Sequence, residues 1–149
     1  MTDVRFYHMT RKRLEQALPE ILTKALERGH RAVVKAGSRE RVEALSSALW
    51  TFDPESFLPH GHARDGFEAE QPVWLTTEDE NPNRADVLVL TDGAQSEKVK
   101  DFALCCDIFD GNDAEATAGA RTRWKTCREE GHSVSYFQQD EQGKWEKKQ

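Results

Sequence analysis

The stretch Ala32-Val33-Val34-Lys35-Ala36-Gly37 is a short, mostly apolar run with two adjacent β-branched residues, and it ends at a glycine. Such a run is typical of a buried strand. Ser38 follows it and can cap a helix that carries Val42, Leu45, Leu49 and Trp50 on one face. A strand followed directly by a helix is the repeating unit of an α/β fold, so we expect the rest of the chain to repeat it.

The residues before this unit predict a first strand and a first helix. Residues 3–9 form a short run with aromatic and β-branched side chains, which favours a strand. From residue 14 to residue 27 apolar side chains recur at alternating spacings of three and one, which is the pattern of an amphipathic helix, and Gly29 is its natural end. Pro19 lies inside this pattern and predicts either a kink or a later start of the helix.

The residues after the unit continue the alternation. We expect a long loop over 51–72, strands over 72–77, 85–90 and 102–109, an acidic turn over 78–84 and a helix over 113–130. A last strand over 133–137 is followed by a charged tail from about residue 138. These elements predict one α/β domain over residues 1–149, with three layers, α/β/α, around a largely parallel sheet.

Composition limits the classes of function. The chain carries a net charge of −6, with +4 in residues 1–50, −12 in residues 51–115 and +2 in residues 116–149. An acidic chain repels phosphates overall, which argues against direct DNA binding as the main activity. The N-terminus does not resemble a secretory signal and no apolar run is long enough to cross a membrane, so we expect a cytoplasmic protein without a membrane partner.

The sequence lacks the motifs of nucleotide-binding enzymes. Neither Gly-x-Gly-x-x-Gly nor Gly-x-x-x-x-Gly-Lys-[Ser/Thr] occurs, and Met9-Thr10-Arg11-Lys12-Arg13 stands where the first phosphate loop of such a fold would be. Bulky side chains there keep phosphates away from the backbone amides. We therefore expect no cofactor, no catalytic residue and no resident metal.

Two groups of residues leave an enzymatic reading open. His60 and His62, with Asp65 nearby, could hold a metal or act as a base, or they could be solvated histidines of a surface loop. Cys105 and Cys106 could include a nucleophile, but cysteines in an apolar strand usually pack as small apolar groups. The three cysteines include no Cys-x-x-Cys pair, so we expect reduced thiols and no zinc site.

Two further segments suggest protein binding. Arg121, Lys125 and Arg128 recur at helical spacing with Trp124 beside them, so three cations and an indole share one face that suits an acidic, aromatic-ended peptide; the alternative is a solvated helix face. The second segment follows the helix that ends near residue 50. Its large apolar side chains either fold back on the core or form a protein-binding patch; they are Trp50, Phe52, Phe57 and Leu58.

At these places the sequence resembles the chi subunit family of bacterial DNA polymerase III. The resemblance rests on Phe6-Tyr7 in the first strand, on the segment from Leu49-Trp50 to Glu55-Ser56-Phe57-Leu58-Pro59-His60, and on Ala120-Arg121-Thr122-Arg123-Trp124-Lys125. It covers nearly the whole chain, and the pattern around Trp50, Pro54 and Phe57 is its most specific part.

The resemblance implies a nucleotide-binding-like fold without enzymatic activity, which links the clamp loader, through its psi subunit, to single-stranded-DNA-binding protein. The residues that match the site for the acidic, Phe-terminated tail of that protein are Arg121, Trp124, Lys125 and Arg128, with Phe109 as a pocket wall. Trp50, Phe57 and Leu58 fall where the family contacts psi or a competing repair helicase. DNA would then be reached only indirectly, within the replisome at the nucleoid.

Two alternatives remain at this point. One is a small nucleotide- or metal-dependent enzyme that uses the His60/His62 loop. The other is a direct binder of single-stranded DNA through aromatic stacking and the basic ends of the chain.

Overall fold

The computed structural model describes residues 2–51, 59–63 and 65–148, and in these residues the predicted strands and helices occur in the predicted order, together with two short strands that were not predicted, at residues 61–62 and 145–147. The strands are β1 (Asp3–Met9), β2 (Ala32–Lys35), β3 (Gly61–His62), β4 (Val73–Thr76), β5 (Val87–Leu90), β6 (Leu104–Asp110), β7 (Ser133–Gln139) and β8 (Trp145–Lys147). The helices are α1 (Leu14–Glu27), α2 (Arg39–Thr51), the short 3-10 helix η1 (Val99–Asp101) and α3 (Ala114–Glu129).

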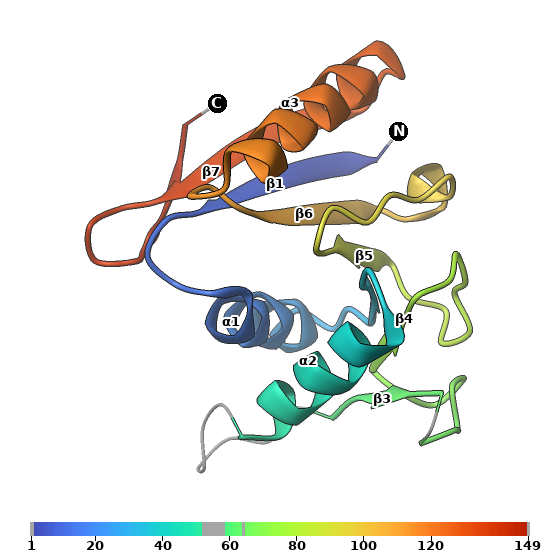
Figure 1. Ribbon diagram of the computed structural model, residues 1–149. Helices are drawn as coiled ribbons and strands as arrows, with labels where there is room; N and C mark the ends of the chain where they lie inside the picture. The colour runs from blue at the N-terminus through green and yellow to red at the C-terminus, as the bar shows by residue number, and fades with distance from the viewer. Residues whose placement is uncertain (1, 52–58, 64, 149) are drawn as a thin grey trace.

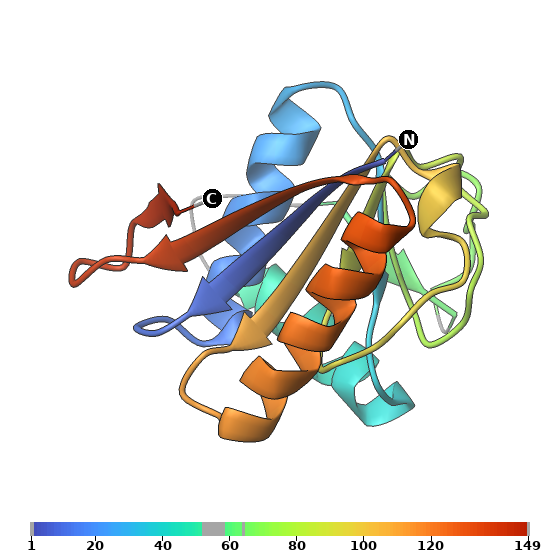
Figure 2. The same cartoon turned by 90° about the horizontal axis from the view of Figure 1, so that it is seen from above.

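All these strands form one sheet in the order β3-β4-β2-β5-β6-β1-β7-β8. Every neighbouring pair is parallel except β7 and β8, which are antiparallel. Helices α1 and α2 cover one face and α3 covers the other, as Figures 1 and 2 show from two sides. The expected three-layer α/β/α arrangement around a largely parallel sheet is confirmed.

Two apolar layers hold the sheet between the helices. Leu18, Leu22 and Leu45 of α1 and α2 pack on the side chains of β2 and β6 on one face. On the other face Ala120 and Trp124 of α3 pack on Val4 and Phe6 of β1 and on the neighbouring strands. Residues that alternate along a strand point to opposite faces, so each buried strand serves both layers.

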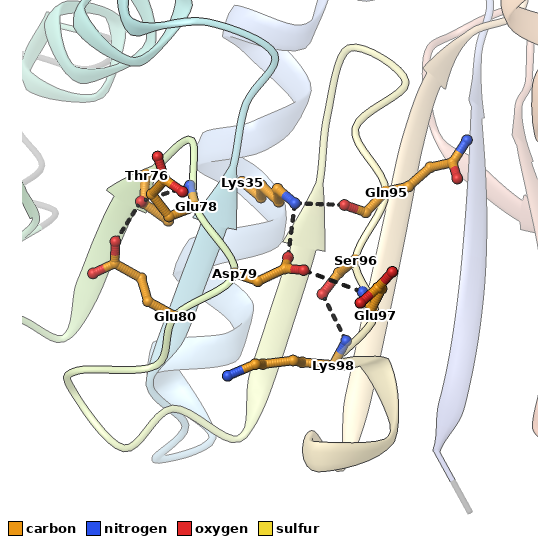
Figure 3. A network of polar contacts seen from close by, with 9 residues as sticks. All are labelled: Lys35, Thr76, Glu78, Asp79, Glu80, Gln95, Ser96, Glu97 and Lys98. Carbon is orange, nitrogen blue, oxygen red and sulfur yellow. Dashed lines mark hydrogen bonds and ion pairs between the residues drawn. The ribbon is translucent and has the colours of Figure 1, made fainter.

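On the α3 face, α3 packs on β1, β6 and β7, whereas the part of the sheet around β2, β4 and β5 carries η1 and acidic loops that a polar network holds in place (Figure 3). Lys35 Nζ donates to Asp79 Oδ1 at 2.7 Å and to the Gln95 carbonyl at 2.6 Å. The Lys35 ammonium is the main reason why the pKa of Asp79 lies below its usual value. Glu80 accepts from the Trp74 indole and the Thr76 hydroxyl. The acidic middle of the chain therefore has a structural role.

Helix α1 spans Leu14–Glu27 as the apolar spacing predicts, with Pro19 buried inside it, so the alternative of a later start is excluded. The prediction of the last strand is wrong. The strand predicted over 133–137 is not the last, because β7 continues to Gln139 and β8 follows. Within the charged segment from about residue 138, β8 pairs with the end of β7 as a hairpin, and the Trp145 ring contacts the Tyr7 ring edge-on with centroids 5.0 Å apart. No helix in the described ranges is long and apolar enough to cross a membrane.

Candidate functional site

Helix α3 carries the predicted basic stripe on its outer surface. The helix begins after Asp113, whose carboxylate accepts from the backbone amides of Glu115 and Ala116 at 2.9 and 3.2 Å. Arg121, Lys125 and Arg128 are exposed. None of the three forms an ion pair with any residue in 2–51, 59–63 or 65–148, so their charges stay available to a partner.

Beside this stripe lies an open cavity of about 300 Å³ between α3 and strands β1, β6 and β7. Most of its wall is aromatic: the Phe6 and Trp124 ring centroids are 5.7 Å apart, and those of Trp124 and Tyr136 are 6.0 Å apart in an edge-on contact. Phe109, expected as a wall, lines it, and Arg121 is its charged member. We call this cavity the α3 pocket; its lining is Phe6, Phe109, Thr117, Ala120, Arg121, Trp124 and Tyr136.

The next cation of the helix faces inward and fixes α3 to the sheet. Arg123 Nε and Nη2 donate to the two carboxylate oxygens of Asp107 at 2.6 and 3.0 Å. Asp107 is 3% exposed, and this burial raises its pKa although Arg123 acts in the opposite direction. A bidentate pair of this kind fixes the position of α3 on the sheet and its rotation about its own axis. It thereby places Arg121 and Trp124 at the pocket.

A profile of known protein families matches residues 1–135 as "DNA polymerase III chi subunit, HolC". The chain belongs to the chi family. It is 31% identical over 105 residues to a probable DNA polymerase III subunit chi of Rickettsia prowazekii, which covers 68% of this chain and 64% of that protein. It is 25% identical over 123 residues to the DNA polymerase III subunit chi of Escherichia coli, with 82% and 83% covered. The resemblance seen in the sequence is thereby confirmed.

The second surface predicted to bind a protein, around Trp50, lies only partly within the described residues of this chi-family chain. Trp50, near the end of α2, is 49% exposed, and its ring lies 4.2 Å from that of His60 between centroids. Trp50 therefore does not fold into the core. Phe57 and Leu58, which were expected beside it, lie outside the described residues, as does Phe52.

The histidine loop has a structural explanation. His60 is 3% exposed, and its Nε2 lies 3.1 Å from both the hydroxyl and the carbonyl oxygen of Ser46. The reading of His60 as a solvated histidine is therefore wrong. His62 Nε2 lies 3.6 Å from Asp65, which also accepts from the His62 amide. Across the described ranges, no group of three or more His, Cys, Asp or Glu side chains is arranged to hold a metal.

The two strand cysteines are part of the core. Cys105 and Cys106 are each 1% exposed and unbridged. Burial raises the pKa of the Cys106 thiol to about 12 and that of Cys105 well above its usual value. Since the thiolate is the nucleophile, these cysteines are suited to packing and not to catalysis.

In the loop after β1, where a nucleotide-binding fold holds phosphate, three backbone amides bind a side chain of the chain itself. The Gln139 side-chain oxygen accepts hydrogen bonds from the backbone amides of Thr10, Arg11 and Lys12 at 2.9, 2.9 and 3.1 Å. Gln139 is 4% exposed and comes from the end of β7. These three amides are thus already hydrogen-bonded within the chain, whereas a phosphate loop needs free backbone amides.

Several residues of the α3 pocket were not predicted. Phe6 and Tyr136 lie on strands far apart in sequence and meet only because β1 pairs with β7. His8 hydrogen-bonds the Tyr136 hydroxyl from behind the pocket. The alternation of strand residues could have shown that Phe6 and His8 share a face, but not which helix covers that face.

Proposed function

We propose that this chain is a non-catalytic adaptor of the DNA polymerase III holoenzyme, and that its α3 pocket binds the acidic, Phe-terminated tail of single-stranded-DNA-binding protein. The observation that carries the proposal is an aromatic cavity bordered by Arg121, on a helix whose Lys125 and Arg128 are exposed and form no ion pair with the part of the chain that the structure describes. Membership of the chi family supports a role in replication.

The chemistry of the pocket matches such a tail in two respects. A cavity of about 300 Å³ walled by Phe6, Phe109, Trp124 and Tyr136 suits one large apolar side chain, which gains free energy by leaving water and by packing edge-on against the rings. Arg121 at the pocket can bind the terminal carboxylate through charge-assisted hydrogen bonds. Lys125 and Arg128 lie one and two turns further along the helix and favour acidic residues preceding the anchor.

The same proposal assigns the opposite part of the molecule to the clamp loader. Trp50 presents half of its surface to solvent, and an exposed indole is typical of the centre of a protein interface. We assign the surface around Trp50 to the psi subunit, or to a repair helicase that competes for it. The chain then bridges two partners and reaches DNA only through them.

The test is a calorimetric titration of the full chain with a synthetic acidic peptide that ends in Ile-Pro-Phe. We expect one-to-one binding that weakens as salt is raised. Arg121→Glu is expected to weaken it at least about tenfold, because a charge-assisted hydrogen bond contributes roughly 1.5–3 kcal/mol and the new carboxylate repels the peptide.

The matched control is Arg39→Glu, which makes the same charge change at an exposed residue of α2. Equal losses in both variants would mean that the peptide responds only to net charge. Unchanged binding by Arg121→Glu would remove the α3 pocket from the proposal.

A further inference from the structure

Behind the α3 pocket, His8 and Tyr136 form a hydrogen-bonded pair that the basic stripe alone does not explain. His8 lies on β1 and Tyr136 on β7, and the His8 Nδ1 atom contacts the Tyr136 hydroxyl. The two rings meet edge-on with centroids 5.8 Å apart. Tyr136 is also part of the pocket wall, together with Arg121. The pair therefore connects a histidine to the place where a bound carboxylate would lie.

The other side of the imidazole is held by the backbone. Gly111 packs so closely on the His8 ring at its Nε2 edge that a Cβ there would overlap it. The Gly111 backbone favours the protonated form of the imidazole. In neutral His8 the Tyr136 hydroxyl donates to Nδ1 when the imidazole carries its proton on Nε2. Nδ1 is then an acceptor, and it takes the hydrogen bond that the Tyr136 hydroxyl donates.

Protonation of His8 reverses this last hydrogen bond. Imidazolium carries a proton on both nitrogens, so Nδ1 becomes a donor and the Tyr136 oxygen becomes its acceptor. The Tyr136 hydroxyl proton is then released from His8 and can be donated to a ligand. The proton that enters His8 comes from solvent, and no other bond changes.

The titratable groups around His8 come from three elements. Arg121 of α3 disfavours imidazolium and Asp110 at the end of β6 favours it, while Tyr136 of β7, whose pKa is raised by burial, is uncharged. Partial burial is the largest cause that lowers the pKa of His8, and Arg121 is the second. Arg121 also acts on Tyr136, which places the guanidinium beside both members of the pair. A carboxylate bound by Arg121 would cancel its repulsion of the imidazolium.

We propose that His8 and Tyr136 make carboxylate binding at the α3 pocket proton-linked: His8 takes up a proton when an acidic peptide binds, and Tyr136 then donates its hydroxyl to the peptide's carboxylate. This inference rests on the proposed function of the pocket. Tyr136 is the residue that contacts the ligand, and His8 is a positioning residue that acts through it.

The direction of the linkage follows from the charges. Since the bound carboxylate stabilises imidazolium, the pKa of His8 is higher in the complex than in the free chain. The gain in affinity is fully present below the pKa that His8 has in the free chain. It is lost as pH rises through the pKa that His8 has in the complex. The carboxylates of the peptide titrate lower, near pH ~4, so a change between about pH 5.5 and 8 reports a histidine.

The experiment is a titration of the full chain with an acidic peptide ending in Phe at about pH 5.5 and at about pH 8. The wild type is expected to bind about tenfold more tightly at the lower pH, which corresponds to a difference of about one pKa unit between the free and bound states of His8. Proton uptake on binding is measured at intermediate pH in buffers of different ionisation enthalpy. His8→Asn keeps a neutral acceptor for Tyr136 and is expected to bind with no pH dependence.

Tyr136→Phe keeps the aromatic wall and removes the hydroxyl, so it is expected to lose the gain in affinity at low pH, to bind at about pH 5.5 about as weakly as the wild type does at about pH 8, and to show little pH dependence. The matched control is His30→Asn on the other face of the sheet, where His30 pairs with Asp86. This variant should keep the wild-type pH dependence. Tight but pH-independent binding by the wild type, or a pH dependence retained in His8→Asn, would overturn the proton linkage and leave the proposed function standing. Absence of binding at both pH values would overturn the proposed function itself.

Discussion

Replacement of Arg123 by methionine is expected to destabilise the fold strongly, because it removes one partner of a buried ion pair. The Asp107 side chain is 5% exposed and that of Arg123 13%, and two hydrogen bonds of 2.6 and 3.0 Å join them. Loss of one partner leaves an uncompensated buried carboxylate, which costs about 3–5 kcal/mol. For a chain of this size the melting temperature should fall by roughly 10 °C.

The pH dependence of this loss of stability is a sharper test of the buried ion pair than the size of the loss. Burial already raises the pKa of Asp107, and without Arg123 it rises further. An acid whose pKa is raised by folding stabilises the folded state fully below its unfolded pKa, near ~4, and this contribution is lost as pH rises through the folded pKa. The deficit of Arg123→Met should therefore grow as pH rises above the unfolded pKa of Asp107, near ~4.

Urea unfolding followed by circular dichroism measures this deficit. The double variant Asp107→Asn/Arg123→Met carries no buried charge and should recover part of the stability and lose the added pH dependence. A loss below about 1 kcal/mol in Arg123→Met, or a deficit that is constant with pH, would contradict the account of a desolvated pair that positions α3.

Three other predictions concern the rest of the fold. Gln139→Ala should cost at least about 2 kcal/mol in urea unfolding, because three backbone amides lose their acceptor, whereas Gln138→Ala, its neighbour in β7, should cost much less. Lys35→Met should cost about 1 kcal/mol at neutral pH and less under acid; the Asp79 pKa is lowered by folding, so that pair stabilises above the unfolded pKa and its contribution is lost as pH falls through the folded value. Cys106, with a pKa of about 12, should react with a thiol reagent only after unfolding.

Local patterns predicted most of the architecture. The apolar run Ala32–Lys35 and the capping serine, whose hydroxyl accepts from the Arg41 amide at 3.2 Å, specify a strand and a helix without long-range information. The end of the chain was missed because β8 is short and its residues are mostly charged. What holds it is the packing of Trp145 on Tyr7, a contact between the two ends of the sequence.

The candidate site, too, was predicted only where local sequence patterns determine it. The basic stripe of α3 is visible in the sequence because helical spacing places Arg121, Lys125 and Arg128 near one another. The cavity beside it is not, because its walls come from strands whose order no local pattern reveals. The hydrogen bond between His8 and Tyr136 joins residues 128 positions apart, and it exists only because β1 lies between β6 and β7.

In the proposed complex, a Phe-terminated acidic tail inserts its last side chain into the α3 pocket. Intermolecular nuclear Overhauser contacts between the full chain and a peptide with an isotope-labelled terminal phenylalanine would locate that ring. We expect contacts from the ring to Phe6, Trp124 and Tyr136, and their loss when the terminal Phe is replaced by Ala. Contacts that gather around Trp50 instead, or a complex in which the terminal ring stays in solvent, would contradict it.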